Sequence, residues 1–384
     1  MIKSYKTEID PTPEQKTKIN KTIGTCRYMY NFYISHNKSL YEQGEKFMSA
    51  YTFITWFNNE YLPNNPDKLW IKEVSTKSVK QSVINSQIAF KKFFNQQTKF
   101  PRYKTKKNDN TKMYFVRANK TRIICCERHR IKIDTLGWLK IKEKGYIPID
   151  KPIISGTISK KAGRYYISVM VEEPEAPKPE LNPEGLGIDL GITNLATLSD
   201  GRTFKNINKT KRVKDLEKQL KRQQRKLSKK YEAQKRIPKE ERTNKNIEKQ
   251  ILKVQKLYQT LTNIRTDYIN QIISEIVKTK PSYITIEDLN VRGMMKNKYL
   301  SKAVKDQKFR EFREKLIAKS KELGIEVRLV DRFYPSSKLC NNCGHIKKDL
   351  KLSDREYICE CGYKADRDYN ASLNLRDAKV YTIA

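Results

Sequence analysis

The sequence has no uninterrupted apolar run long enough to cross a membrane. Its 384 residues are enough for two or three domains. Its amino terminus, residues 1–6, also lacks the apolar core of a signal peptide. These two absences argue against an integral membrane protein and against a secreted one. We therefore expect a soluble protein that works inside the cell.

Cysteine does not have the arrangement of a secreted disulfide framework. The chain contains seven cysteines, an odd number, and two of them, Cys125 and Cys126, are adjacent. Such usage indicates a reducing compartment. We expect Cys26, Cys125 and Cys126 to be ordinary buried thiols.

Acidic residues are far outnumbered by basic ones. The chain has 43 Asp and Glu against 80 Lys and Arg, which gives a formal net charge of +37. This excess opposes compaction by self-repulsion, and a polyanion is the obvious partner to neutralise it. The 22 Tyr and 13 Phe residues suit stacking on unpaired bases. An anionic membrane surface is the alternative partner, but no segment is apolar enough to cross a bilayer.

The most informative segment is 187–197, in which a short apolar run carries one aspartate, Asp189, and leads into a glycine-containing turn. The pattern predicts a strand, a tight hairpin and a second strand that ends near Asp200. A carboxylate inside an apolar strand is costly to bury unless it is paired or holds a cation. The alternative interpretation is an aspartate that caps the turn.

Two later carboxylates favour the cation site. Glu287 lies at the carboxyl end of a second apolar strand, and Asp368 lies in the first turn of a predicted helix. Acidic residues in a first turn are commonly helix caps. A strand aspartate, a strand glutamate and a helix-start aspartate in this order, however, resemble the carboxylate set of an RNase H-like nuclease core. Asp366 is the alternative to Asp368, and Asp288 is the alternative to Glu287.

Phosphodiester hydrolysis explains why carboxylates are needed. The reaction must activate water and stabilise charge on the attacking and leaving oxygens, and two magnesium ions roughly 4 Å apart do both. Hard oxygen ligands suit magnesium best. No histidine base is required, which fits a chain with only three histidines. We assign Asp189 as the bridging ligand of two Mg²⁺ ions, with Glu287 and Asp368 completing the two metal shells.

Four cysteines near the carboxyl end form two tight knuckles, each followed by a glycine. Cys340 and Cys343 make the first knuckle, and Cys359 and Cys361 make the second. The spacing predicts one tetrahedral Zn²⁺ site, even though the second knuckle is Cys-x-Cys. Four thiolates leave no position open for water, so this zinc would be structural. A redox dithiol is the alternative, and His345 could replace one thiolate.

The amino-terminal half predicts a β module that is divided by helices. Residues 3–10 alternate like a strand, residues 75–95 form a credible helix, and residues 111–175 contain short strands typical of a small barrel or sandwich. The helices would thus be inserted between the first strand and the rest of the module. A proline-rich linker follows, and we place the domain boundary near residue 182.

Two charged segments have two interpretations each. The basic stretch 99–107 is either a solvated linker or a nucleic-acid contact. Residues 205–268 predict two long helices that are broken near Pro238 into a hairpin. This hairpin is either a solvated arm or a guide for a nucleic-acid backbone, or it serves as both. The individual candidates for nucleic-acid binding are Arg102, Tyr103, Lys104, Arg332 and Arg367.

Taken together, these motifs resemble TnpB proteins, the transposon-encoded relatives of compact type V CRISPR effectors. The segments that carry the resemblance are Gly-Ile-Asp-Leu-Gly-Ile at 187–192, Ile-Glu-Asp-Leu-Asn at 286–290, the four-cysteine ribbon and Asp-Arg-Asp-Tyr-Asn-Ala at 366–371. Looser matches lie at 13–15, 27–31 and 100–104. The likeness covers almost the whole chain. One departure is Ser372, where the family usually has a second alanine.

The resemblance implies a multidomain α+β fold. A split wedge β-barrel with an inserted helical recognition domain would precede an RNase H-like (RuvC) α/β nuclease domain that carries a zinc ribbon. The expected bounds are 1–10 and 100–182 for the wedge barrel, 11–99 for the helical insertion, 183–384 for the nuclease domain, 205–268 for its charged helical hairpin and 336–364 for its zinc ribbon.

The resemblance also implies an RNA-guided DNA endonuclease. A guide RNA from the transposon end would pair with double-stranded target DNA beside a short motif that the protein reads, and a single RuvC site would cut by a two-metal mechanism. Such a protein would work in the prokaryotic cytoplasm, associated with the nucleoid. Two nucleic-acid partners would account for the charge of +37. The sequence indicates no oligomeric state.

Other functions share parts of these motifs. Gly-Ile-Asp-Leu-Gly also resembles the first phosphate loop of actin-like ATPases, but the chain has no Asp-x-Gly-Gly run for the second loop among its 14 glycines. A type V CRISPR effector has the same chemistry and differs by a neighbouring repeat array. A non-cleaving RNA-guided DNA binder is disfavoured because all three carboxylates are present. A transposase that acts without RNA would not copurify with RNA.

Overall fold

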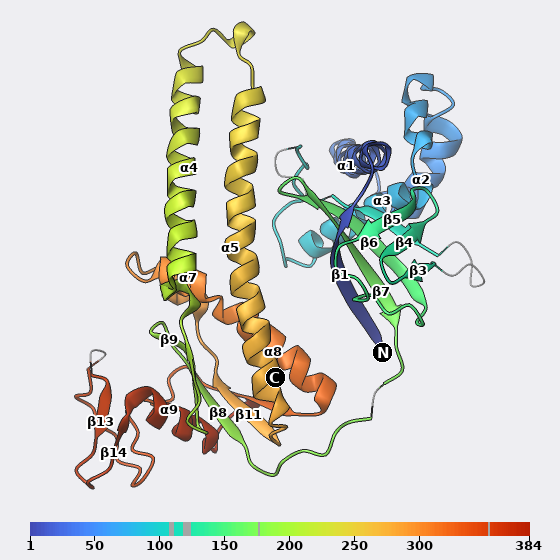
Figure 1. The fold of residues 1–384 in the computed structure, drawn as a ribbon. Coiled ribbons are helices and arrows are strands. Elements are labelled where there is room, and N and C mark those ends of the chain that lie inside the picture. Colours follow the sequence, from blue (N-terminus) through green and yellow to red (C-terminus); the bar gives the residue numbers. More distant parts are fainter. Residues whose placement is uncertain (107–110, 118–123, 176, 352–353) are drawn as a thin grey trace. The chain divides into compact units, whose positions relative to one another are not determined.

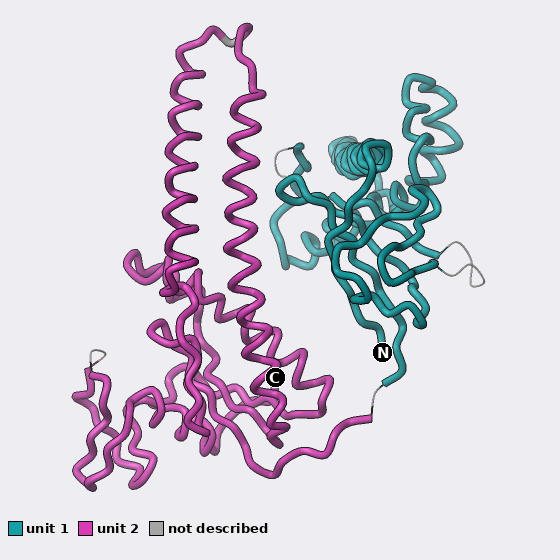
Figure 2. The backbone as a smooth tube through the Cα atoms, in the orientation of Figure 1, with its two compact units in different colours: residues 1–175 teal, residues 176–384 magenta. Residues whose placement is uncertain are grey.

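The computed structural model describes residues 1–106, 111–117, 124–175, 177–351 and 354–384. The chain divides into two compact units, residues 1–175 and 176–384 (Figure 2). The change of unit falls in the proline-rich segment that follows the last strand of the first unit. None of the described helices combines the length and the apolar character that a membrane span requires.

A seven-stranded antiparallel sheet forms the centre of the first unit (Figure 1). Its strands are β1 (Ile2–Asp10), β2 (Met113–Val116), β3 (Cys126–Glu127), β4 (Arg130–Ile133), β5 (Gly137–Ile141), β6 (Ile153–Lys161) and β7 (Arg164–Glu172). The spatial order is β2-β6-β7-β1-β5-β4-β3. β1 pairs with β7 on one side and with β5 on the other. The first strand of the chain therefore lies inside a sheet whose other strands all come after the helical segment.

Three α-helices lie between β1 and β2 in the sequence: α1 (Pro13–Glu42), α2 (Ala50–Trp56) and α3 (Thr76–Phe94). A π-turn, η1 (Phe57–Tyr61), and a 3₁₀ segment, η2 (Pro66–Glu73), connect α2 to α3. α1 begins with a capping box between Thr12 and Gln15. The Gln15 side-chain amide also donates to the carbonyls of Leu136 (2.8 Å) and Trp138 (2.9 Å), which fixes the start of α1 on the sheet.

The second unit contains a six-stranded mixed sheet in the order β10-β9-β8-β11-β12-β15. The strands are β8 (Leu186–Leu190), β9 (Asn194–Leu198), β10 (Thr203–Lys205), β11 (Tyr283–Glu287), β12 (Glu326–Val330) and β15 (Thr382–Ile383). The three central strands, β8, β11 and β12, run parallel to one another, and the flanking strands are antiparallel. Parallel strands align their carboxyl ends at one edge of a sheet, where ligand sites of such sheets form.

A long helical pair extends from this sheet: α4 (Lys211–Lys235) and α5 (Lys245–Lys278) (Figure 1). α5 continues beyond the predicted hairpin 205–268, because its last turns bury Ile269, Ile272 and Ile276 in the core of the sheet. The remaining helices are α6 (Val291–Met294), α7 (Ser301–Gln307), α8 (Phe309–Leu323) and α9 (Arg367–Arg376). A two-stranded hairpin, β13 (Glu356–Ile358) and β14 (Lys364–Asp366), precedes α9.

Candidate metal centres

Strand register brings Asp189 beside Glu287. β8 and β11 are parallel neighbours in which Ile188 pairs with Ile286. Both isoleucines are fully buried in the core formed with α5 and α8. Because successive side chains of a strand point to opposite faces, the next residue on each strand points away from that core. Asp189 and Glu287 therefore leave the sheet on the same face, at its carboxyl-terminal edge.

The same face is covered by α9, and Gly187 makes this packing fit. A Cβ atom at Gly187 would lie 1.9 Å from the carbonyl oxygen of Ser372 and 2.5 Å from the amide nitrogen of Arg376. Both atoms belong to the backbone of α9, so only glycine allows the helix to lie this close to β8. Sequence reasoning missed this role. The available signal was the position of Gly187, two residues before Asp189 on the same face of an apolar strand.

The start of α9 separates the roles of two aspartates. Asp366 caps the helix, since its side chain accepts from the amides of Asp368 (2.9 Å) and Tyr369 (3.0 Å), and it is exposed. Asp368 is partly buried and forms an ion pair with Arg367 at 3.0 Å. Asp368 is thus the carboxylate that α9 carries toward β8, while Asp366 is engaged in capping.

The other predicted alternative, Asp288, is also engaged elsewhere, in an ion pair with Arg313 of α8. Glu287 instead accepts a hydrogen bond from the hydroxyl of Ser336, a buried residue of the loop between β12 and the first cysteine knuckle. Burial raises the pKa of Glu287, and the hydrogen bond from Ser336 opposes this rise.

The Asp189 carboxylate has no hydrogen-bond donor among the residues that the structure describes. Burial raises its pKa well above the ordinary value of 3.8, and the negative charges of Glu287 and Asp368 raise it further. The nearby cation of Arg367 opposes the rise. A partly buried carboxylate that faces two other acids without a donor is a site that a divalent cation would satisfy.

In the absence of divalent ions, we expect the protein to lose stability as the pH rises. The folded chain holds the Asp189 proton at pH values where the unfolded chain has released it, because the folded pKa is raised. This stabilisation is fully present below the ordinary pKa of 3.8 and is lost as the pH rises through the raised value. Each unit of raised pKa corresponds to about 1.4 kcal/mol.

The measurement is thermal unfolding of the wild type and of Asp189→Asn in magnesium-free buffers of increasing pH. The variant should melt above the wild type, by a margin that grows with pH until Asp189 is fully ionised. A difference in melting temperature between variant and wild type that stays constant across the pH series would show that the Asp189 carboxyl is not the destabilising group.

The four cysteines of the two knuckles form a compact cluster. Their sulfur atoms lie within 4.8 Å of one another, with 3.7 Å between Cys340 and Cys361 and 3.6 Å between Cys343 and Cys359. Zinc–sulfur bonds of about 2.3 Å place the sulfurs of a tetrahedral site roughly 3.8 Å apart. The cluster therefore fits one Zn²⁺ ion. It is the only group among the described residues in which three or more potential metal ligands meet so closely, so the carboxylates of the other centre lie farther apart.

The scattered cysteines differ from the expectation in one respect. Cys26 is buried in α1 and Cys126 is partly buried, whereas Cys125 is exposed. The prediction of a buried thiol is therefore wrong for Cys125. It directly precedes β3, a two-residue strand at the edge of its sheet, and an edge position leaves one side of the chain open to solvent.

Two asparagines of α9 connect the two centres. Asn370 and Asn374 are buried and lie one helical turn apart. Asn374 donates to the carbonyls of Ser336 and Leu339, both at 2.7 Å, and Asn370 donates to the Leu339 carbonyl at 2.7 Å. These bonds hold the backbone that leads into Cys340 against the helix that carries Asp368. The cysteine cluster, α9 and the Ser336 partner of Glu287 thus form one connected framework.

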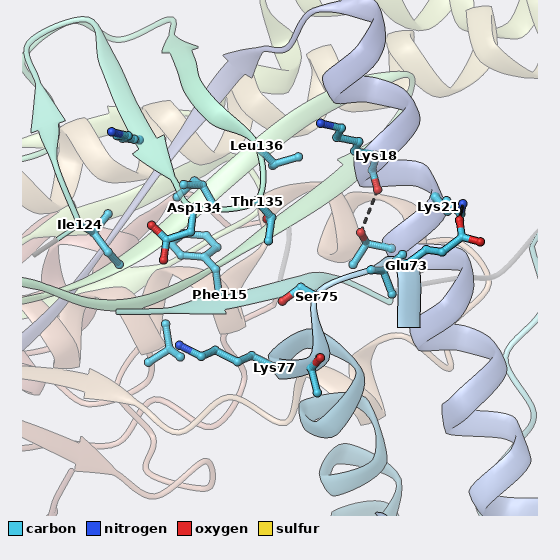
Figure 3. Close-up of a pocket in the computed structure, with 16 residues that line it drawn as sticks. Lys18, Lys21, Glu73, Ser75, Lys77, Phe115, Ile124, Asp134, Thr135 and Leu136 are labelled. Carbon is cyan, nitrogen blue, oxygen red and sulfur yellow. Dashed lines mark hydrogen bonds and ion pairs between the residues drawn. The ribbon is translucent and has the colours of Figure 1, made fainter. Parts of the chain in front are cut away.

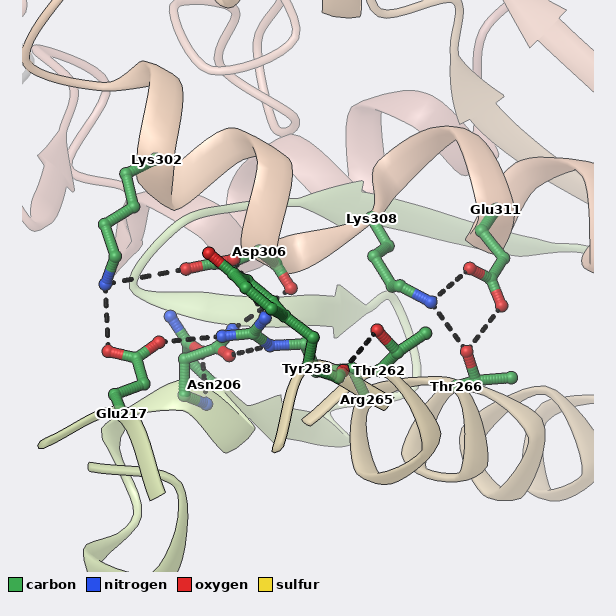
Figure 4. A network of polar contacts seen from close by, with 11 residues as sticks. Asn206, Glu217, Tyr258, Thr262, Arg265, Thr266, Lys302, Asp306, Lys308 and Glu311 are labelled. Carbon is green, nitrogen blue, oxygen red and sulfur yellow. Dashed lines mark hydrogen bonds and ion pairs between the residues drawn. The ribbon is translucent and has the colours of Figure 1, made fainter. Parts of the chain in front are cut away.

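A second polar network joins α4, α5 and α7 (Figure 4). Arg265 of α5 is largely buried and forms ion pairs with Glu217 of α4 (2.8 Å) and Asp306 of α7 (2.9 Å). The next residue of α7, Gln307, donates to the carbonyls of Gly191 and Ile192 at 3.1 and 3.2 Å. The base of the hairpin, α7 and the β8–β9 turn are therefore linked by polar contacts.

In the first unit, the predicted basic stretch is held against α1. The Asn31 side chain accepts from the Lys104 amide (2.8 Å) and donates to its carbonyl (2.9 Å). The Lys104 ammonium lies 3.8 Å from the ring centre of Tyr30. The hydroxyl of Ser35 donates a hydrogen bond to the hydroxyl of Tyr103. Residues 103–104 are therefore anchored rather than a free linker, and Arg102 is exposed beside them. Residue 107, the last of the stretch, lies outside the described residues.

The first unit also contains a cavity of about 560 Å³ between α1, the start of α3 and the sheet (Figure 3). Phe115, Ile124 and Leu136 contribute apolar lining. The lysines that line it are Lys18, Lys21, Lys77 and Lys132. Lys21 pairs with Glu73.

Three family models match the sequence. A model described as a probable transposase, OrfB of IS605, matches residues 167–298, and a Cas12f1-like TNB domain matches residues 309–375. A "Putative RNA-guided DNA endonuclease" of Streptomyces pristinaespiralis is 29% identical over 384 residues, which cover 97% of this chain and 88% of that protein. These matches are of the TnpB type. The resemblance in its sequence motifs is thereby confirmed.

Two further similarities concern a second relative and a solved structure. "Putative RNA-guided DNA endonuclease InsQ" of Escherichia coli K12 is 27% identical over 390 residues, with 97% of this chain and 91% of that protein covered. A solved structure titled as the Cas12f1-sgRNA-target DNA complex aligns with a TM-score of 0.63 at 12% identity, covering 100% of this chain and 99% of that chain. This second likeness shows a shared α+β fold. The description of the first sheet as a wedge barrel remains a prediction.

The third family model is described as a helix-turn-helix domain and matches residues 1–46. In this chain the same segment folds as strand β1 followed by one uninterrupted helix, α1. The segment therefore contributes a central strand of the sheet and a helix packed with α3, rather than two helices joined by a turn.

Proposed function

We propose that this chain is an RNA-guided DNA endonuclease with a single RuvC-type site. The observation that carries the proposal is the Asp189 carboxylate, which is partly buried, lacks a donor among the described residues and faces Glu287 and Asp368. The names of the relatives and the fold of the Cas12f1 complex support a guide RNA and a double-stranded DNA target as its partners.

Asp189, Glu287 and Asp368 would hold two Mg²⁺ ions, because an all-oxygen donor set suits magnesium. When bound, the ions would activate water and stabilise the charge on the attacking and leaving oxygens. Asp189 would hold the ions from β8, one of the three central strands of the sheet. Ser336 orients Glu287, and α9 presents Asp368. Arg367 pairs with Asp368 and would be the nearby cation for a phosphate of the substrate.

The remaining predicted parts complete this proposal. The sheet of the first unit would be the wedge barrel, built from residues 1–10 and 100–182, with residues 11–99 as the helical recognition insertion. Residues 183–384 would be the nuclease domain. Its hairpin 205–268 would follow a nucleic-acid backbone, and its ribbon 336–364 would hold one structural Zn²⁺. The exposed side chains of Arg102 and Arg332 are available for phosphate contacts.

Sequencing the RNA that copurifies with the protein tests the guide. DNA that contains the complement of that RNA, flanked by randomised sequence, is then offered to the complex with Mg²⁺. We expect cleavage that requires RNA, Mg²⁺ and a particular flanking motif. Cleavage that proceeds without RNA would overturn the proposal in favour of a transposase. Guide-dependent binding without cleavage would identify a non-cleaving derivative, and a repeat array beside the gene would identify a CRISPR effector.

Gly187→Ala should reduce cleavage by roughly 100-fold, because a displacement of about 1 Å in a catalytic group has that effect. The added methyl group meets the α9 backbone, so the helix and Asp368 must move away from Asp189. Gly24→Ala in α1 is the matched control, since its Cβ would meet only the Arg27 side chain at 4.0 Å. Wild-type cleavage rates for Gly187→Ala would refute the requirement for close packing of α9.

A further inference from the structure

Phe333 is exposed at the same edge of the sheet as the carboxylates. β11 and β12 run parallel, and their register pairs Glu287 with Val330. The chain that follows Val330 therefore emerges next to Glu287. Three residues later lies Phe333, whose exposed fraction is 86%. Few large apolar side chains of the described chain are as exposed.

Local contacts show that this exposure is built into the loop. The Asp331 carboxylate accepts from the Phe333 amide at 2.8 Å, and the Asp331 carbonyl accepts from the Tyr334 amide at 3.0 Å. Tyr334 turns inward, packs beside Leu375 and donates its hydroxyl to the Asn374 carbonyl at 3.2 Å. The turn thus directs one aromatic ring into the protein and the next one into solvent.

Both ends of this loop are anchored at the carboxylate centre. Val330 belongs to the strand paired with β11, and Ser336 donates its hydroxyl to Glu287 itself. The position of Phe333 relative to Glu287 is therefore fixed by the fold. A rigid ring costs little conformational entropy when it binds a partner, which suits a positioning contact.

The charge around the ring indicates the chemistry of the partner. Arg332 precedes Phe333 and is exposed, and Arg292, which follows the adjacent strand β11, is exposed as well. An exposed aromatic ring with a cationic neighbour such as Arg332 is the combination that binds single-stranded nucleic acid, with the ring stacking on a base and the cation contacting a phosphate. A duplex keeps its bases stacked on each other, so only an unpaired segment can use the ring.

We propose that Phe333, with Arg332, is a base-stacking contact that positions the unpaired DNA strand at the Glu287 edge for cleavage. The proposal rests on the nuclease function proposed above and adds a substrate-positioning residue to it. A stacked base next to Glu287 limits how far the strand can slide along the site. The contact accepts any base, because every base has a π-face.

The test compares Phe333→Ala and Phe333→Trp with Val380→Ala, which removes another apolar side chain that is 81% exposed. All three are made in the Asp189→Asn background, so that DNA is bound without being cut. Single-stranded DNA carrying one 2-aminopurine at successive positions is then titrated. We expect fluorescence quenching at one or two positions in the parent and in Phe333→Trp, and its loss in Phe333→Ala.

In the cleaving chain loaded with its copurified RNA, Phe333→Ala should lower kcat/KM about 5- to 150-fold, which corresponds to about 1–3 kcal/mol per stacked base. An abasic site at the quenched position should lower wild-type cleavage by a similar factor and Phe333→Ala cleavage by no further factor. Val380→Ala should match the wild type in both assays.

The outcomes distinguish a failure of the stacking contact from a failure of the nuclease function on which it rests. Guided cleavage by the wild type with unchanged quenching and kinetics in Phe333→Ala would overturn the stacking contact alone. Absence of guided cleavage in the wild type would overturn the nuclease proposal, while the quenching assay, which needs no guide, would still report the contact. A change in oligomeric state with unchanged DNA quenching would instead assign Phe333 to a protein interface and overturn the stacking proposal.

Discussion

Asp189→Asn should abolish cleavage while leaving the protein folded and able to bind its guide RNA and target DNA. The carboxylate is the proposed bridging ligand of both ions, and an amide carries no charge to hold them. The loss of several kcal/mol of transition-state stabilisation corresponds to on the order of 10³-fold or more in rate. Folding should not suffer, since the substitution removes a charge that burial and two neighbouring acids disfavour.

Magnesium provides a second readout that does not depend on activity. A ligand that binds only the folded state raises the melting temperature. Adding Mg²⁺ should therefore raise the melting temperature of the wild type and have little effect on Asp189→Asn. Asp200→Asn is the matched control, because Asp200 is an exposed acid that pairs with Arg202 on the neighbouring turn. Asp200→Asn should cleave and respond to Mg²⁺ like the wild type.

Two results would contradict this prediction. Full cleavage by Asp189→Asn would remove Asp189 from the metal site. Loss of guide-dependent DNA binding together with cleavage would show that the residue is not purely catalytic. Glu287→Ala and Asp368→Ala should behave like the Asp189 variant, since each removes one of the three proposed ligands.

Cys340→Ser should release the zinc and disorder the ribbon, with a large loss of cleavage. Zinc-finger peptides bind structural zinc with about 10–16 kcal/mol, which is comparable to the stability of a whole domain. Without it, the backbone at Leu339 would no longer be held in place for Asn370 and Asn374. Because the same backbone carries Ser336, the partner of Glu287, disorder in the ribbon should reach the carboxylate centre.

The measurements are zinc content per chain, melting temperature and cleavage rate. Cys125→Ser is the control, since it replaces an exposed cysteine outside the cluster and should change none of the three. Ser336→Ala tests the contact with Glu287 separately from the zinc site. It should keep the zinc content and the melting temperature near those of the wild type and still reduce the cleavage rate by about 10- to 100-fold. Unchanged zinc content, melting and cleavage in Cys340→Ser would refute the connection.

The predictions for both candidate centres came from the sequence because they depend on local patterns. Two thiolates separated by one or two residues reach the same ion without help from the rest of the chain, so Cys340, Cys343, Cys359 and Cys361 predicted a zinc site. An aspartate in an apolar strand is unfavourable wherever that strand lies, so Asp189 indicated a ligand. The charge of +37 likewise needed no structure to indicate a polyanion.

The positions of these groups relative to one another needed the tertiary structure. Only strand register shows that Asp189 lies beside Glu287, and only packing shows that Gly187 must lack a side chain for α9 to approach. The hydrogen bond from Ser336 to Glu287 and the exposed ring of Phe333 have no local signature either. Short-range spacing determines which ligands and elements a segment can form, whereas contacts between distant segments depend on the packing of the whole unit.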